Sequence, residues 1–133
     1  MTLPEPLQRL LAQPNPAVIA TVRQDGQPVS VATWYLFEEG RIIVNMDAGR
    51  KRLAYLRDEP RVSLTVLDKE NWYTHVSVTG TVTDLTDDAD LADIDRIATA
   101  YTGKPYANRE RRRVTAAIDI TSWHVWPPDA LDV

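Results

Sequence analysis

The sequence contains no cysteine and only two histidines, His75 and His124. The absence of cysteine excludes a disulfide framework, a thiol nucleophile and a cysteine-ligated metal site, and it fits a reducing, cytoplasmic compartment. Two histidines are too few for a histidine-rich metal centre, and a lone histidine on a strand is more often a hydrogen-bonded polar group than a base. We therefore expect no metal site and no thiol chemistry.

Long apolar runs are also missing. No stretch is long enough to cross a bilayer as a helix, and residues 1–16 lack the basic-then-apolar pattern of a signal peptide. The glycine fingerprints of P-loop and dinucleotide-binding proteins are absent, as is the Gly-x-Ser-x-Gly turn of serine hydrolases. The sequence thus predicts no membrane partner, and it contains none of these catalytic or nucleotide-binding motifs.

The chain has no excess of positive charge. Its 15 Lys and Arg against 19 Asp and Glu give a net charge of −4 and a pI near 5.1, which argues against nucleic acid as the main partner. Positive charge is local instead, in residues 50–52 and 109–113. A length of 133 residues fits one domain, residues 1–133, with a single core. A mildly acidic domain with two basic segments is expected to bind small anions.

Six segments show the alternation or the β-branched content that is typical of strands. Asp25-Gly26 and Glu38-Glu39-Gly40 predict hairpin turns, and Gly80 predicts a bulge or a bend inside a long strand. The predicted fold class is therefore mainly β, with an antiparallel sheet that is closed or nearly closed, because closure removes exposed edges. The six strands are expected at residues 17–23, 29–37, 42–44, 61–67, 72–85 and 113–120.

Three short helices are expected beside the strands. The first lies within residues 4–13 and ends before Pro14, and the second begins at Arg50 and ends before Pro60. The third begins at Asp87, where an acidic first turn suits the helix dipole, and ends at Gly103.

The second helix opens with three consecutive cations, Arg50, Lys51 and Arg52. Cations at a helix N-terminus meet the positive end of the dipole, which is unfavourable unless an anion lies there. The unpaired N–H groups of that turn bind phosphate or carboxylate readily. This turn is either a phosphate grip or a solvated basic turn, and for a bare charge run the solvated turn is the commoner case. The segment 109–113 is interpreted as a solvated basic loop, and the less favoured alternative is a contribution to the anionic tail of a cofactor.

Two pairs of adjacent aromatic residues, Trp34-Tyr35 and Trp72-Tyr73, fall on predicted strands. Neighbouring side chains on a strand face opposite ways, so one member of each pair must face outward. An outward ring could form a wall of a pocket for a planar ligand. The alternative, with core on one side and a dimer interface on the other, is equally open.

Several weak motifs occur in a familiar order: DGQPVSVATWYLFEEGRIIVNM, then DAGRKRLAYLRDEPRVSL, then a strand ending in VTGTV, then RRRVTAAIDITSWHVWPP. This order resembles the split-barrel flavin-binding superfamily, which includes the pyridoxamine 5′-phosphate oxidases and the deazaflavin (coenzyme F420)-dependent reductases. The resemblance covers the chain from about Ala17 to Pro128. It implies a six-stranded split barrel that works as a homodimer, with the flavin in a groove between subunits.

The resemblance also distinguishes between branches of the superfamily. The phosphate-binding Ser-Arg-Lys of the oxidases falls on Arg50-Lys51-Arg52, where Arg50 replaces the serine. The oxidases bring an Arg and a Lys to the cofactor on the second strand, and this chain has Ser30 and Tyr35 there. The deazaflavin branch fits better, because F420 carries a phosphodiester and an oligoglutamate tail that suit three cations.

The resemblance therefore implies an F420-dependent reductase that moves a hydride to an enone, imine or quinone-like substrate. The protein would bind and orient the cofactor, with no obligatory catalytic side chain. The alternatives are an FMN-dependent enzyme of the same fold and a non-enzymatic flavin- or F420-binding protein. The expected partners are a second copy of the chain and a small-molecule substrate. The expected cofactor-binding residues are Val31, Ala32, Thr33, Trp34, Val44, Asn45, Met46, Arg50, Lys51 and Arg52.

Overall fold

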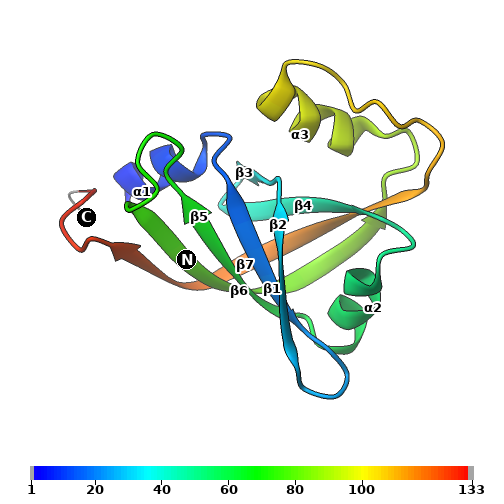
Figure 1. Cartoon of the computed structure of the whole chain (residues 1–133), viewed down its shortest axis with the longest axis horizontal. Coiled ribbons are helices and arrows are strands. Elements are labelled where there is room, and N and C mark those ends of the chain that lie inside the picture. The colour runs from blue at the N-terminus through cyan, green and yellow to red at the C-terminus, as the bar shows by residue number, and fades with distance from the viewer. Residues whose placement is uncertain (1, 132–133) are drawn as a thin grey trace.

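The structure, a computed structural model, describes residues 2–131 (Figure 1). Over this range the chain forms three helices and seven strands, and the strands make one antiparallel sheet. The elements in chain order are α1 (Glu5–Leu11), β1 (Ala17–Val22), β2 (Pro28–Thr33), β3 (Leu36–Glu38), β4 (Arg41–Asp47), α2 (Lys51–Asp58), β5 (Arg61–Leu67), β6 (His75–Asp87), α3 (Ala92–Thr102) and β7 (Arg113–Trp126).

The strand order across the sheet is β2-β1-β5-β6-β7-β4-β3. Hairpin connections join β1 to β2 and β3 to β4, as the turn residues predicted. A third hairpin joins β5 to β6. Gly26 and Gly40 have φ angles of 90° and 77°, which only glycine adopts without strain. The mainly β, antiparallel class expected from the sequence is confirmed.

The predicted strand over residues 29–37 is wrong as a single element. It is interrupted at Trp34-Tyr35, so that β2 pairs with β1 while β3 pairs with β4. This division raises the strand number in the described residues from the expected six to seven. β2 and β3 are the two edge strands of the sheet, and only Trp34 and Tyr35 connect them. Because two residues span only a short distance, the sheet must curl until the end of β2 lies near the start of β3.

The interruption has a local cause in the hydrogen bonds of Tyr35. Its backbone N–H donates to the Tyr101 hydroxyl at 3.3 Å, and its own hydroxyl donates to the carbonyl of Gln13 at 3.1 Å. The side chain is buried in the main core. These partners replace the strand ladder at this point and turn the chain from one sheet edge to the other.

Three further predicted strand ranges were wrong. The strand expected at 42–44 covers Arg41–Asp47, because it pairs with β7 over its whole length. The strand expected at 72–85 begins only at His75, because residues 71–74 form the turn that closes the β5–β6 hairpin. The last strand does not end at Ile120 but continues to Trp126, paired with the start of β6. Residues 121–126 show no regular alternation of polar and apolar side chains, and they form a strand because they pair with the start of β6.

The helices match their predictions more closely. α1 packs Leu7, Leu10 and Leu11 into the core. The third helix starts at Ala92 rather than Asp87, because Asp87 still belongs to β6 and Leu91 adopts a left-handed φ of 62°. The buried side chains of α3 form a small cluster of their own, apart from the main core. The helix is therefore a wall beside the sheet (Figure 1). No helix in residues 2–131 is long and apolar enough to span a membrane.

Gly80 sits at a register shift between β6 and β7, which confirms the predicted bulge. A Cβ at this position would lie 2.6 Å from the Asp119 carbonyl oxygen and 2.6 Å from Cγ2 of Ile118. Contacts of this length force the backbone of β7 to move.

We therefore expect Gly80→Ala to lower the free energy of unfolding by about 1–3 kcal/mol, as overpacking of a tight site does. Urea denaturation followed by circular dichroism measures this change. Ser77→Ala, an exposed change on the same strand, should stay within about 0.5 kcal/mol of the wild type. Equal stabilities for the two variants would contradict the close-approach explanation.

Candidate functional site

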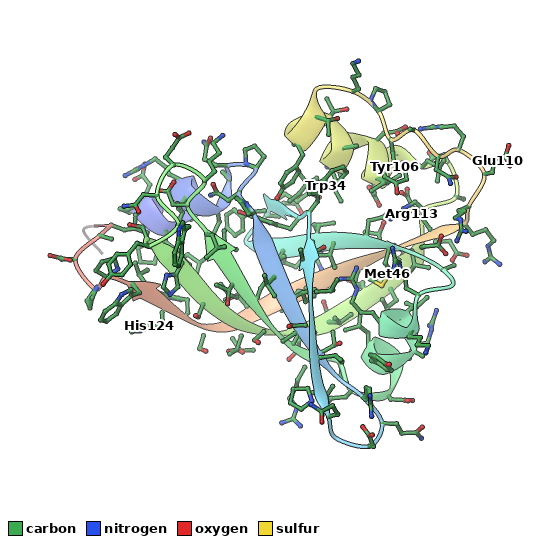
Figure 2. All side chains as sticks on the ribbon, in the orientation of Figure 1. Trp34, Met46, Tyr106, Glu110, Arg113 and His124 are labelled. Atoms are coloured by element: carbon green, nitrogen blue, oxygen red, sulfur yellow. The ribbon has the colours of Figure 1, made fainter. Side chains whose placement is uncertain are left out.

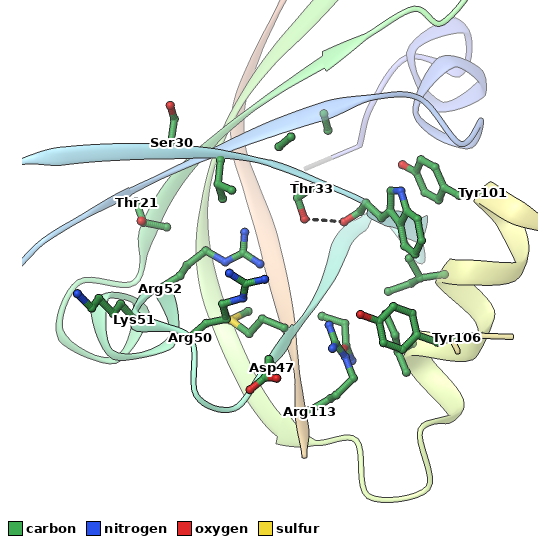
Figure 3. Close-up of a pocket in the computed structure, with 18 of the residues that line it drawn as sticks. Thr21, Ser30, Thr33, Asp47, Arg50, Lys51, Arg52, Tyr101, Tyr106 and Arg113 are labelled. Atoms are coloured by element: carbon green, nitrogen blue, oxygen red, sulfur yellow. Dashed lines mark hydrogen bonds between the residues drawn. The ribbon is translucent and has the colours of Figure 1, made fainter. Parts of the chain in front are cut away.

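A pocket with a volume of about 1410 Å³ lies between the β2 edge of the sheet, the end of β4, the start of α2 and the wall formed by α3 (Figure 3). This volume exceeds the roughly 300–1,000 Å³ of ordinary small-molecule sites. The pocket is therefore large enough for an extended ligand or for two ligands side by side.

Nine of the ten residues predicted to bind a cofactor line this pocket. They are Val31, Ala32, Thr33, Trp34, Asn45, Met46, Arg50, Lys51 and Arg52. Val44 does not. It shares a face of β4 with Ile42, pairs with Ala116 across the sheet, and is fully buried in the core.

The basic turn forms one end of the pocket. Arg50 is the N-cap of α2, the first turn contains no acidic residue, and no side chain caps the helix. In Figure 3 the guanidinium groups of Arg50 and Arg52 point the same way, into the pocket, whereas the Lys51 ammonium extends in the opposite direction. The three cations are adjacent in sequence, but only Arg50 and Arg52 point into the pocket.

Arg52 is held in an unfavourable environment. Its Nε is buried and has no hydrogen-bond partner in the described residues. Burial lowers its pKa, and the charges of Arg50 and Arg113 lower it further. None of the ion pairs found in residues 2–131 involves Arg50, Arg52 or Arg113. An anion placed beside Arg50 and Arg52 would supply both the missing hydrogen-bond partner of Arg52 and the missing negative charge.

Arg113 is the one member of the 109–113 segment whose position contradicts the solvated-loop interpretation. Arg109 and Arg111 are indeed exposed and pair with Asp95 at 2.6 Å and Asp47 at 2.9 Å. Arg113 instead donates from Nε to Oδ1 of Asn45 at 2.7 Å. Its segment was favoured as a solvated loop, with cofactor contact only as the alternative, because only the register of β4 with β7 brings Arg113 to the pocket.

Asn45 connects several elements around the pocket. Its Nδ2 donates to Oδ2 of Asp88 at 3.1 Å and to Oγ1 of Thr115 at 3.0 Å. The buried Asp88 carboxylate also accepts from the backbone N–H groups of Asp93 and Ile94, at 3.0 and 2.9 Å. Asp88 therefore satisfies the open N–H groups at the start of α3 and fixes that helix to the sheet.

Aromatic rings form the other end of the pocket. Trp34 stacks on Tyr101 with centroids 5.3 Å apart and an interplanar angle of 15°. Tyr106 meets the Trp34 ring edge-on at 6.4 Å, and the Arg113 guanidinium lies 4.7 Å above the Tyr106 centroid. Neither tyrosine was predicted, because both come from a segment far from β2 in sequence.

The four aromatic residues noted in the sequence separate into three environments. Trp34 lines the pocket and Tyr35 lies in the core. Trp72 and Tyr73 lie in the β5–β6 turn, 72% and 55% exposed, and do not line the pocket. The expectation that one member of a pair walls a pocket is met by Trp34 alone.

The pocket provides binding groups rather than an obvious general base. Its lining contains neither histidine, and His124 lies at the far end of the sheet from Trp34, Tyr106 and Arg113 (Figure 2). No cluster of three or more metal-ligating side chains occurs among residues 2–131. The lining joins a basic end to an aromatic end, an arrangement that suits a ligand with a planar ring and an anionic group.

Fold and pocket together define a class of small antiparallel β proteins with a pocket that has two arginines at a helix start. A family model places the chain within this class: the model for pyridoxamine 5′-phosphate oxidase matches residues 3–127, so the chain belongs to this family. No protein of curated function matches the sequence.

Solved structures share the fold of this chain. A structure described as an F420 reductase is 27% identical, covers 92% of this chain and 98% of its own, and superposes with a TM-score of 0.83. A conserved hypothetical protein from Mycobacterium tuberculosis is 23% identical over 100% and 90% of the two chains, with a TM-score of 0.73. An FAD and heme binding protein from Mycobacterium smegmatis is 18% identical over 94% and 71%, with a TM-score of 0.68.

The Tyr101 hydroxyl links the aromatic end to the N-terminal segment, donating to the carbonyl of Asn15 at 2.7 Å. Burial raises the pKa of Tyr101 to about 12, above the roughly 10 of a free phenol. The folded state thus favours the neutral phenol. Its contribution to stability is complete below about pH 10 and is lost as the pH rises toward 12.

Tyr101→Phe should therefore be less stable than the wild type at pH 8 by about 1–3 kcal/mol, because it removes two hydrogen bonds of the hydroxyl, one to the Asn15 carbonyl and one from the Tyr35 N–H. The difference should shrink between about pH 10 and 12, because only the wild type carries a phenol at this position to deprotonate. Urea unfolding across this pH range measures both quantities. If the stability difference between the wild type and Tyr101→Phe stayed constant from about pH 8 to 12, the raised pKa of Tyr101 would be contradicted. Tyr73→Phe, which removes an exposed phenol, is the control.

Proposed function

We propose that this protein is an F420-dependent oxidoreductase that moves a hydride between the deazaflavin and a small organic substrate such as an enone, imine or quinone-like compound. The observation that carries the proposal is the unpartnered, buried Nε of Arg52 beside a second inward guanidinium. The similarity to a solved F420 reductase supports it.

Arg50 and Arg52 would hold the phosphodiester of F420. Guanidinium groups bind phosphate oxygens through two parallel N–H donors, and the N–H groups at the start of α2 point at the same place. The anion would also relieve the repulsion that lowers the Arg52 pKa. When bound, the deazaflavin ring supplies the hydride, and the protein supplies position and shelter from water.

The ring would lie along the β2 edge. Because β2 is the outermost strand of the sheet, half of its main-chain N–H and C=O groups have no strand partner. Val31, Ala32, Thr33 and Trp34 line the pocket, so the outward main-chain groups of this stretch can hydrogen-bond a heterocycle. Asn45 and Met46 form the floor opposite. Val44 contributes only to the core behind them.

FMN is the second candidate, and Tyr35 argues against it. The oxidase branch needs a cation at this position, whereas the Tyr35 side chain is buried in the core with its hydroxyl bonded to the Gln13 carbonyl. Ser30 does line the pocket but carries no charge. A compact dianionic phosphate would thus lack two partners. A protein that binds F420 without catalysis remains the third candidate.

We also propose that two copies close a split barrel around the site. Val31 and Trp34 border the pocket and are 47% and 37% exposed, and the open edge of β2 lies beside them. Exposed apolar side chains beside a ligand groove are typical of an interface. A second subunit would cover them and enclose the ligand more completely than one subunit can.

Light scattering coupled to size exclusion should give about twice the chain mass of 15.0 kDa. The expected reason is burial of the β2 edge and its apolar neighbours. A Val31→Glu variant should shift the protein toward monomer, because a charge in an apolar interface is costly to desolvate. A wild-type monomer at micromolar concentration would exclude the two-subunit site.

Removing one inward cation should weaken F420 binding without unfolding the chain. A hydrogen bond to a charged group contributes roughly 1.5–3 kcal/mol, so Arg52→Ala should raise the Kd about ten- to a hundredfold. Lys51→Ala is the matched control. Lys51 borders the pocket, but its ammonium extends in the direction opposite to the two guanidinium groups (Figure 3), so this variant should change the Kd less than about threefold. Equilibrium fluorescence titration of F420 measures both.

Equal losses in Arg52→Ala and Lys51→Ala would show general electrostatic attraction rather than a directed grip. Titration with FMN decides between the cofactors, since tighter binding of FMN than of F420 would replace the proposal with the oxidase-like alternative. Oxidation of reduced F420 by an added enone separates an enzyme from a protein that only binds the cofactor.

A further inference from the structure

Arg113 belongs to the aromatic end of the pocket rather than to the basic turn. It comes from the first residue of β7, and Asn45 and Tyr106 fix it. In Figure 3 it lies beside Tyr106, across the pocket from the Arg50 and Arg52 guanidinium groups. The pocket therefore contains two separate cationic positions, of which a phosphate at the start of α2 uses one.

The fixed contacts leave one side of the Arg113 guanidinium available. Its Nε donates to Asn45 at 2.7 Å, its plane lies over the Tyr106 ring, and its backbone carbonyl accepts from the Asp88 N–H at 2.9 Å. The two terminal nitrogens make no hydrogen bond to the described residues. Side by side in one plane, they match the two oxygens of a carboxylate.

The carboxylates around Arg113 are already engaged. Asp47 accepts from the Gly49 N–H at 2.8 Å and from Arg111 at 2.9 Å. These contacts lower its pKa, with only a minor contribution from Arg113. Asp93 accepts from Thr115 at 2.7 Å and from Arg96 at 3.0 Å. Neither carboxylate forms an ion pair with Arg113, so its charge is available to a ligand.

We infer that Arg113 and the rings of Trp34, Tyr101 and Tyr106 form a substrate subsite that selects a planar, conjugated compound bearing a carboxylate. The stacked rings bind the flat conjugated system, and the Arg113 fork binds the acid. The proposed enone and quinone-like acceptors are already conjugated, so the carboxylate is the added element of selectivity. Describing the ligand as a substrate rests on the proposed function, whereas its charge preference does not.

A matched pair of probes tests the charge preference: coumarin-3-carboxylate and the uncharged coumarin-3-carboxamide. Both have the same ring, the same activated double bond and nearly the same shape. Titration calorimetry, with the protein alone and with the protein saturated by oxidised F420, gives the two Kd values without turnover. The acid should bind about ten- to a hundredfold more tightly than the amide.

Variants then locate the preference. Arg113→Gln should reduce the ratio of the two Kd values to within about threefold, and Arg113→Lys should keep part of it, since charge survives but the fork does not. Arg57→Gln removes an exposed cation that does not line the pocket and should leave the ratio unchanged. Thermal unfolding of each variant shows that the fold is retained, and Arg113→Lys carries the test if Arg113→Gln does not fold.

The Arg52→Gln variant tests whether the Arg113 subsite is separate from the anion position at Arg50 and Arg52. With F420 bound, this variant should keep the acid preference, because the subsite lies across the pocket. Two results would overturn the inference. In one, the wild type binds the acid and the amide equally. In the other, Arg52→Gln abolishes the preference for the acid as fully as Arg113→Gln does. If F420 does not bind at all, the proposed function fails, while the probe ratio in the cofactor-free protein still decides the subsite.

Discussion

The side-chain amide of Asn45 is the interaction on which both the wall and the charge of the pocket depend. It donates to Asp88 and Thr115 and accepts from Arg113. Through Asp88 it fixes the start of α3, since that carboxylate satisfies two N–H groups of the helix. A neutral amide can do this because it donates and accepts at once, which no carboxylate or hydrophobic side chain of this size can do. Buried polar groups joined in this way stabilise one arrangement only when every member is satisfied.

The unpaired arginines are the opposite kind of feature. Most arginines of the described residues find a carboxylate at the surface, while Arg50, Arg52 and Arg113 line the pocket and find none. Partial burial and mutual repulsion make this arrangement unfavourable in the absence of a ligand. Residues that lower stability in this way are commonly kept for binding. The family fold alone would not indicate that these arginines bind a ligand, because proteins with one fold can have many different functions.

The sequence was a good guide to local structure and a poor one to contacts across the sheet. Turns at Gly26 and Gly40, the bulge at Gly80 and the basic start of α2 depend on neighbouring residues, and each was predicted. Arg113 and Tyr106 reach the pocket only through strand register and the return of the chain after α3, which no local pattern encodes. Even within the basic turn, sequence order did not show that Arg50 and Arg52 point inward while Lys51 does not.

The strand interruption at Trp34-Tyr35 shows how a wrong boundary can mark a functional position. β-Branched and apolar residues run through 29–37, so periodicity favoured one strand. The fold instead buries Tyr35 and bonds its backbone to Tyr101, which leaves Trp34 to stack on that same ring in the pocket. The break ends β2 beside the pocket with an unpaired edge and starts β3 at the opposite edge. Leu36, the first residue of β3, then packs against the buried side chains of α3. One tertiary hydrogen bond thus replaces a ladder contact, and the exposed strand edge, the aromatic wall and the curl of the sheet follow from it.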